Sequence, residues 1–125
     1  MVYKRFEELP VWQDARRVVK DIYDLLSRNE KLRRDFSLSD QLKRASYSIM
    51  LNISEGFERD TNKEFAYFLN VAKGSAGEVR SILYIIEDNN HVPVSELTQV
   101  RYEIETVSTQ LSNFRSFILK RGVSK

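Results

Sequence analysis

Asn52-Ile53-Ser54-Glu55-Gly56 and Phe68-Leu69-Asn70-Val71-Ala72-Lys73-Gly74-Ser75 are the two segments that say most about the fold of this chain. Both lie inside stretches whose apolar residues recur every three or four positions, as on one face of a helix. Asn, Gly and Ser are poor helix formers. A helix keeps such residues when close packing or a buried polar network outweighs their low propensity. The segments therefore predict two helices that approach closely and share polar contacts.

Apolar residues at helical spacing continue outward from these segments and divide the chain into four helices. The breaks between them are a charged connection at residues 27–37, a tight turn at 58–61 and a loop at 88–94. The predicted helices cover residues 10–28, 38–58, 62–88 and 95–121.

Residue types that favour helix ends support these boundaries. Pro10 suits a first helical turn, where its missing N–H is not needed. Thr61 and Glu64 form a capping-box pattern at the start of the third helix. The other expected signals are Ser37 or Ser39 and Ser95 as N-caps, and Gly122 as the stop of the last helix.

Length and composition fit a single all-α domain over residues 1–125. The chain of 125 residues is about one domain long, and its four glycines and two prolines leave few turns for a many-stranded β fold. Long helices joined by short loops favour an up-and-down antiparallel four-helix bundle. The alternative is a long bundle or coiled coil that closes only when subunits associate.

Several function classes find no support in the composition. The chain has no cysteine, so disulfides and thiolate metal sites are excluded. Its single histidine, His91, is expected to be an exposed turn residue, and it cannot supply the Glu-x-x-His pairs of di-iron bundles or a two-histidine haem site. Glu103 and Glu105 point in different directions on a helix. We expect no metal, no cofactor and no enzymatic activity.

The amino terminus and the hydropathy pattern give an expectation for location. Residues 1–8 are too polar for a signal peptide, and no run approaches the ~20 apolar residues of a membrane span. We therefore expect a cytoplasmic protein without membrane contact. The formal net charge of +2 is too small to imply a polyanionic partner by itself.

Polar residues occupy predicted core positions in the second and third helices. A buried amide must find hydrogen-bond partners, and the tight turn places these helices side by side. Asn52 is therefore expected to face Ala72 or Ser75, with Gly56 and Gly74 allowing close approach. The pattern is either a polar functional site or a satisfied core amide that fixes helix register, and the second is favoured. The predicted network comprises Asn52, Glu55, Ser75 and Glu78, with Arg59 at its border.

These segments also carry a resemblance to a known family. Residues 6–15, Phe6-Glu7-Glu8-Leu9-Pro10-Val11-Trp12-Gln13-Asp14-Ala15, are similar to the family's opening F-x-x-L-x-V-W-Q-x-A. Gln41-Leu42-Lys43-Arg44-Ala45 resembles Q-L-R-R-A, and Asn52-Ile53-Ser54-Glu55-Gly56 resembles N-I-A-E-G. Residues 65–75 are similar to F-x-x-F-L-x-I-A-x-G-S, and Glu78 follows. The family comprises four-helix-bundle proteins encoded within intervening sequences of bacterial large-subunit ribosomal RNA genes, also labelled ribosomal proteins of the S23 type.

The resemblance covers about two thirds of the chain, and the last helix is matched only by its pattern. Lys43 stands where the family tends to have Arg, and Ser54 where Ala is usual. The resemblance implies an all-α bundle that assembles into a ring-like homo-oligomer, with a pentamer as the expected form. A related family, the accessory proteins of diversity-generating retroelements, looks like the same bundle and associates with nucleic acid and a reverse transcriptase. For the intervening-sequence proteins themselves the resemblance implies no established activity.

Basic residues gather at both ends of the predicted bundle, and Lys125 belongs to the cluster at the chain termini. Such clusters bind phosphates, and an oligomer would multiply a modest patch. The ordinary alternative is that these cations complement a helix dipole and keep the protein soluble. The candidate nucleic-acid-binding residues are Lys43, Arg44, Arg59, Lys63, Arg115, Lys120 and Arg121.

A second apolar face on the second helix also needs a partner. One bundle core cannot easily bury both sides of a helix, and monomers seldom expose large apolar patches. A subunit interface is the favoured explanation, with an unusually wide core as the alternative. The predicted interface comprises Tyr47, Met50, Leu51 and Phe57, extended by Tyr67 and Val71.

Together these observations predict a non-catalytic, homo-oligomeric helical bundle that binds RNA or DNA through basic surfaces. The rival interpretation is a protein–protein scaffold whose oligomer docks a reverse transcriptase or another protein, with its charges serving solubility alone.

Overall fold

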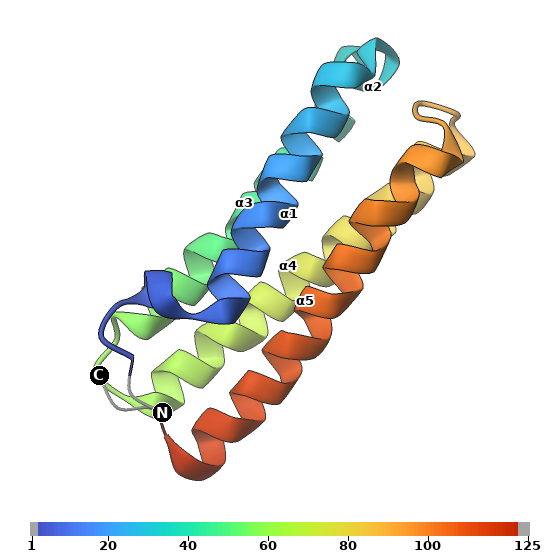
Figure 1. Ribbon diagram of the computed structural model, residues 1–125. Coiled ribbons are helices and arrows are strands. Elements are labelled where there is room, and N and C mark those ends of the chain that lie inside the picture. Colours follow the sequence, from blue (N-terminus) through green and yellow to red (C-terminus); the bar gives the residue numbers. More distant parts are fainter. Residues whose placement is uncertain (1–2, 123–125) are drawn as a thin grey trace.

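The computed structural model describes residues 3–122, and over this range the chain is almost entirely helical with no β-strand. Lys125, which the predicted terminal cluster includes, lies outside the described residues. The helices are η1 (Phe6–Glu8), α1 (Pro10–Arg28), α2 (Glu30–Arg34), α3 (Phe36–Phe57), α4 (Asn62–Asp88) and α5 (Val94–Arg121) (Figure 1).

The long helices α1, α3, α4 and α5 form an up-and-down bundle. Helix α1 packs against α3 and α5, and α4 packs against the same two helices on the other side. Figure 1 shows both chain termini and the α3–α4 connection at one end, which we call the terminal end. Helix α2 and the α4–α5 connection lie at the opposite end, which we call the α2 end. The predicted bundle is confirmed, with helix boundaries within two residues of those expected.

The core follows helical spacing but differs from the predicted seam. Ile53 of α3 and Ala76 of α4 are fully buried, whereas the neighbouring Asn52 and Ser75 are only partly buried. In α3 the buried residues Ile49, Ile53 and Gly56 follow a step of four and then of three, whereas the predicted seam took three and then four. Both orders fit 3.6 residues per turn. Asn52 and Ser75 therefore lie at the edge of the buried stripe.

The charged connection before α3 contains the short helix α2, which sequence analysis did not predict. Asp35 follows α2 and caps α3 by accepting a hydrogen bond from the backbone N–H of Leu38 at 3.3 Å. Neither Ser37 nor Ser39 is the cap. Ser39 is instead buried, and its hydroxyl donates to the backbone carbonyl of Asp35 at 3.0 Å.

The ends of α4 and α5 agree with the expected signals in two of three cases. Thr61 caps α4 by accepting from the backbone N–H of Glu64 at 3.1 Å, as predicted. Pro93 precedes α5 without a side-chain hydrogen bond, so Ser95 is not a cap. Gly122 ends α5 with φ of 77°, a conformation that glycine adopts without strain, as expected of the stop.

Close approach of α3 and α4 is confirmed at one glycine and absent at the other. A Cβ atom added to Gly56 would lie 2.7 Å from Cβ of Phe68 and 3.0 Å from Cδ1 of Phe65. At Gly74 an added Cβ would meet nothing within 4 Å. The expectation that Gly74 allows the backbones to approach is therefore wrong.

No helix in the described range is long and apolar enough to cross a membrane.

Candidate nucleic-acid interface

The predicted polar network exists in part, through a serine that sequence analysis missed. The side-chain amide of Asn52 donates to the carbonyl of Ser48 at 2.8 Å and to its hydroxyl at 3.0 Å. The Ser48 hydroxyl lies 3.1 Å from the hydroxyl of Ser75 and joins α3 to α4. Among the described contacts, Asn52 therefore bonds within its own helix and is linked to Ser75 through Ser48, and Asn52 and Ser75 line the same groove between α3 and α4. Ser48 lies one turn before Asn52, and this spacing was the available signal.

The remaining members of the network, Glu55 and Glu78, are exposed and line a groove between α3 and α4, so the prediction that they are buried is wrong. Glu78 accepts a hydrogen bond from the amide of Gln41, and Glu55 pairs with Arg59 at 2.8 Å. The groove is open, with a volume of about 450 Å³, and Ser75 also lines it. Its polar groups are largely satisfied by one another, which fits a structural role.

The predicted subunit interface is exposed at some positions and buried at others. Leu51 of α3 and Tyr67 of α4 are 55% and 63% exposed, and Tyr47 and Val71 are also exposed. Phe57 was predicted at this interface but is only 3% exposed. The remaining predicted member, Met50, is partly buried against the core.

Phe57 belongs to the core because it lies at the terminal end of α3, where the helices close over an aromatic cluster. Its ring packs edge-on against Phe65 with 5.8 Å between ring centroids. Phe65 in turn packs against Phe114 at 5.7 Å. Phe57 is therefore not part of the exposed surface, and we call Tyr47, Leu51, Tyr67 and Val71 the α3–α4 apolar face.

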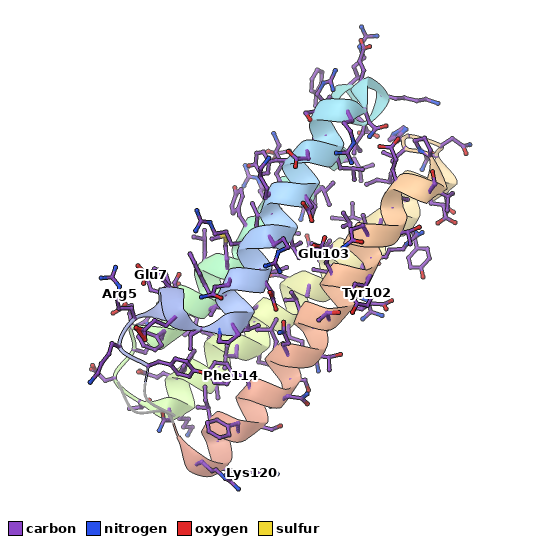
Figure 2. The ribbon with its side chains drawn as sticks, in the orientation of Figure 1. Arg5, Glu7, Tyr102, Glu103, Phe114 and Lys120 are labelled. Carbon is purple, nitrogen blue, oxygen red and sulfur yellow. The ribbon has the colours of Figure 1, made fainter. Side chains whose placement is uncertain are left out.

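The terminal end carries fewer available cations than the sequence indicates. Arg59 pairs with Glu55, and Arg5 pairs with Glu7 at 2.8 Å. Arg115 is partly buried, and its Nε has no hydrogen-bond partner among the described residues. Figure 2 shows Arg5 and Glu7 together near the first residues of the chain and Lys120 apart from them at the tip of α5.

Exposed lysines and arginines remain at the terminal end, but acidic residues surround them. Lys63, Lys120 and Arg121 are exposed and form no ion pair with another described residue. This end also carries Glu7, Glu8, Glu58, Asp60 and Glu64. The predicted residues of the terminal cluster therefore share one end without forming a strongly positive surface.

At the α2 end, the segment 27–44 is positive. It contains six basic and three acidic residues, a net charge of +3, whereas the end of α4 and the start of α5 place Glu87, Asp88 and Glu96 at the same end of the molecule. Arg34 pairs with Glu30 and Arg44 with Asp40, each at 2.9 Å. In the described part of the chain, no carboxylate pairs with Lys31, Arg33 or Lys43.

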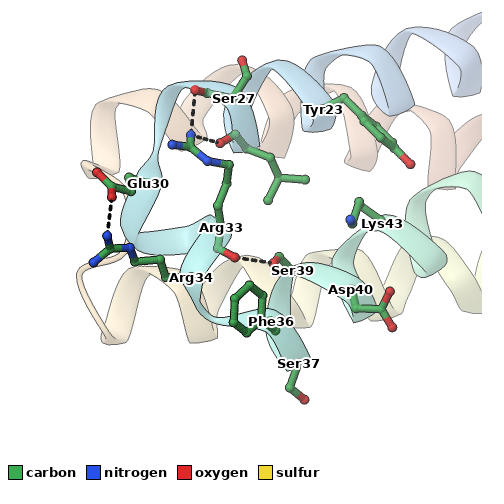
Figure 3. A pocket seen from close by; sticks show the side chains of 11 residues that line it. Tyr23, Ser27, Glu30, Arg33, Arg34, Phe36, Ser37, Ser39, Asp40 and Lys43 are labelled. Carbon is green, nitrogen blue, oxygen red and sulfur yellow. Dashed lines mark hydrogen bonds and ion pairs between the residues drawn. The ribbon is translucent and has the colours of Figure 1, made fainter.

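An open groove with a volume of about 990 Å³ lies at this end, between α1, α2 and the start of α3. Figure 3 shows Tyr23 reaching it from α1, Arg33 from α2, and Phe36 and Lys43 from α3. Nη1 of Arg33 donates to the carbonyls of Leu26 at 2.8 Å and Ser27 at 2.7 Å, in the last turn of α1. The Leu26 carbonyl also accepts from the backbone N–H of Asn29 at 3.3 Å, and the bonds from Arg33 add to this end of α1 and hold the guanidinium in place. We call this site the α2 groove.

Two aromatic side chains line the α2 groove and remain accessible to solvent. Phe36 is 81% exposed and Tyr23 is 44% exposed. Sequence analysis singled out Lys43 but missed Arg33, Phe36 and Tyr23. The available signal was the run Lys31-Leu32-Arg33-Arg34-Asp35-Phe36, in which an aromatic residue directly follows a basic cluster.

The α2 end is tied to the α4–α5 connection. Nε2 of His91 lies 2.9 Å from Oδ2 of Asp35, and the His91 side chain is only 16% exposed. The expectation of an exposed turn histidine is therefore wrong. The hydrogen bond from His91, together with that from the backbone N–H of Leu38, lowers the pKa of Asp35 below its usual range. Lys31 also donates to the backbone carbonyl of Asn90 at 3.5 Å.

A pair of carboxyl groups between α1 and α5 was also missed. Burial, and then the neighbouring Asp21, raise the pKa of Glu103 to about 7. A raised carboxyl pKa is common at catalytic sites but also occurs in structural pairs. The adjoining cavity of about 200 Å³ is lined by Tyr102 and Thr106, and the Thr106 hydroxyl donates to the backbone carbonyl of Tyr102 at 2.9 Å. This geometry fits a structural pair that shares a proton. Within residues 3–122, no group of three or more His, Asp or Glu side chains could hold a metal ion.

Comparisons with known proteins agree with this architecture. The profile of a family described as 23S rRNA-intervening sequence protein matches residues 7–113. A crystal structure of a protein of unknown function from the S23 ribosomal protein family of Bacteroides thetaiotaomicron VPI-5482 aligns with a TM-score of 0.77 and 19% sequence identity. The alignment covers 84% of this chain and 97% of that chain, and at this identity it shows a shared fold. No curated protein sequence matches the chain.

Proposed function

The chain belongs to the 23S rRNA-intervening sequence protein family, and from this premise we propose that it is a non-catalytic, homo-oligomeric protein that binds nucleic acid. The α2 end is the proposed contact surface. The α3–α4 apolar face is the proposed contact between subunits, in a ring that we take to be a pentamer. The proposed location is the cytoplasm.

The observation that carries this proposal is the set of cations without carboxylate partners at the α2 end. Lys31, Arg33 and Lys43 lie within one end of the molecule, and no carboxylate among the described residues neutralises them. Cations without a carboxylate partner can contact phosphates directly and release the counterions of a nucleic-acid backbone. The terminal end also has three cations without a carboxylate partner, Lys63, Lys120 and Arg121, but in the described contacts none of them is held by backbone carbonyls as Arg33 is.

Oligomerisation would strengthen such binding. The α3–α4 apolar face leaves Leu51 and Tyr67 more than half exposed. A partner that covers this face would remove apolar surface from water, which stabilises association. Because the face lies along the middle of the bundle, several subunits could place their α2 ends on one side of a ring. Their positive charges would then act on the same nucleic acid.

Neutralising selected lysines tests the proposal. The double variant Lys31→Gln, Lys43→Gln removes two free cations from the α2 end, and Lys63→Gln, Lys120→Gln removes two from the terminal end as a matched control. Fluorescence anisotropy would follow the binding of labelled single- and double-stranded oligonucleotides of unrelated sequence between ~50 and ~200 mM salt. We expect the α2-end variant to bind more weakly and the control to bind as the wild type.

The salt dependence gives a second measure. Each lost phosphate contact lowers the slope of log affinity against log salt by about 0.7 for single strands and about 0.9 for duplexes. With two contacts removed, the slope of log affinity against log salt should be smaller in magnitude by about 1.4 to 1.8 for the α2-end variant than for the wild type. If the wild-type oligomer binds no nucleic acid at ~50 mM salt, where phosphate contacts are strongest, the proposal is wrong.

A protein–protein scaffold remains the second candidate, and the α3–α4 apolar face favours it. That face could dock a protein of a different kind, such as a reverse transcriptase, in place of another subunit. In that case the isolated chain would be a monomer and its binding to nucleic acid would be negligible. Light scattering on the isolated chain, together with the anisotropy measurement, separates the two candidates.

A further inference from the structure

We propose that the α2 groove binds a single strand of nucleic acid by stacking a base on Phe36 while the neighbouring cations hold the flanking phosphates. This inference rests on the proposed nucleic-acid binding and goes further by naming the kind of strand and the residue that engages a base. It requires an accessible aromatic ring, preorganised cations beside it and space for a nucleotide.

Phe36 satisfies the first requirement. It is the first residue of α3, and at 81% it has the largest exposed fraction of the large apolar side chains in the described range. The ring lies outside the core because it is largely exposed, and Leu42 of the same helix is the side chain that is fully buried there. Tyr23, from α1, lines the same groove and is 44% exposed.

The cations satisfy the second requirement. Nη1 of Arg33 is held by the carbonyls of Leu26 and Ser27, while its Nε and Nη2 have no acceptor among the described residues. The guanidinium is therefore fixed in position and still has donors for a phosphate oxygen, so little ordering entropy is lost on binding. Lys43 lines the groove from α3 and has no carboxylate partner among the described residues (Figure 3).

Size and chemistry together favour a single strand. The groove has a volume of about 990 Å³, large enough for a nucleotide and its neighbours. Grooves that bind single strands combine a positive surface with aromatic rings on which bases stack. A duplex buries the faces of its bases, so it could use the cations but not the ring.

Other occupants make different demands on Phe36. A protein partner would bury the side chain for its apolar area, which leucine would also supply. A second copy of this chain has the α3–α4 apolar face available, which is separate from the α2 groove. Only stacking requires an aromatic ring, so a leucine at position 36 distinguishes stacking from hydrophobic burial.

The experiment compares Phe36→Leu with the matched control Phe36→Tyr in the full-length protein. The probes are a 12-nucleotide single strand, its duplex, and a strand of equal length that lacks its bases, all at one salt concentration. Stacking contributes enough that its loss should weaken single-strand binding by roughly 5- to 150-fold in Phe36→Leu. We expect Phe36→Tyr to retain wild-type affinity for the single strand. The wild type and both variants should have the same affinity as one another for the duplex, and likewise for the baseless strand. These affinities should be lower than that of the wild type for the single strand.

Each other result overturns the inference in a recognisable way. If Phe36→Leu binds the single strand as well as the wild type does, while Lys31→Gln, Lys43→Gln weakens binding, stacking is wrong and the proposed function stands. If no protein binds any probe, the proposed function itself fails. If Phe36→Leu changes the oligomer mass in light scattering, Phe36 is a subunit contact and not a site for a base.

Discussion

Replacing Gly56 by alanine should destabilise the bundle, whereas the same change at Gly74 should stabilise it. Gly56 lies in the last turn of α3, whereas Gly74 lies in the interior of α4. In a helix interior, alanine is favoured over glycine by roughly 0.5–1 kcal/mol. At Gly74 this gain is unopposed, because an added Cβ would meet nothing within 4 Å.

At Gly56 the same gain is opposed by a clash between helices. The new Cβ would lie 2.7 Å from Cβ of Phe68, an atom fixed to the backbone of α4 that cannot rotate away. It would also lie 3.0 Å from the ring of Phe65, which is fully buried. Overpacking of this kind costs about 1–3 kcal/mol. Gly56→Ala should therefore be less stable than Gly74→Ala by about 1–3 kcal/mol.

Denaturant unfolding followed by circular dichroism measures this difference, at one fixed subunit concentration because the protein is proposed to be oligomeric. Gly77→Ala provides a second control in α4, since nothing lies within 4 Å of an added Cβ there either. Equal midpoints and slopes for Gly56→Ala and Gly74→Ala would refute the close approach of α3 and α4 at Gly56.

Three further predictions follow from the described contacts. Burial and Asp21 raise the pKa of Glu103 to about 7, so its protonated form stabilises the fold at low pH and this stability is lost as pH rises from about 4.5 through 7. Glu103→Gln should therefore raise the free energy of unfolding at pH 8 but not at pH 5, and an equal effect at both would disprove the shift. Leu51→Glu should dissociate the oligomer without loss of helical signal, whereas the control Tyr102→Glu, on the exposed surface of α5, should leave the oligomer intact. Light scattering that finds the same mass for both variants would contradict the proposed interface. Asn52→Ala should cost less than about 1 kcal/mol, because the amide bonds only to Ser48 of its own helix; a loss above about 2 kcal/mol in denaturant titration would show a stronger role.

The sequence predicted the fold well because periodicity and end signals agree along this chain. Pro10, Thr61 and Gly122 each stand at the helix end that their backbone chemistry favours. The sequence predicted less well which residues of each helix are buried in the core. A step of three from Ile49 places Asn52 in the core, whereas α3 takes a step of four there and buries Ile53, and helical periodicity allows both.

The candidate site could be predicted only in part, because most of its properties depend on contacts between distant residues. Lys43 was identified from charge. The role of Arg33 depends on the carbonyls of α1, and the burial of His91 depends on Asp35, 56 positions away in the sequence. The pairing of Arg59 with Glu55 at a spacing of four could have been predicted, and it would have lowered the weight given to the terminal end.

Nucleic acid is proposed to bind at the α2 end. Backbone amide NMR chemical shifts, recorded while a 12-nucleotide single strand is added at low salt, locate the contact surface directly. We expect the largest shifts at Arg33, Phe36 and Lys43, with Lys63 and Lys120 unchanged. Shifts confined to the terminal end, or to the α3–α4 apolar face, would contradict it.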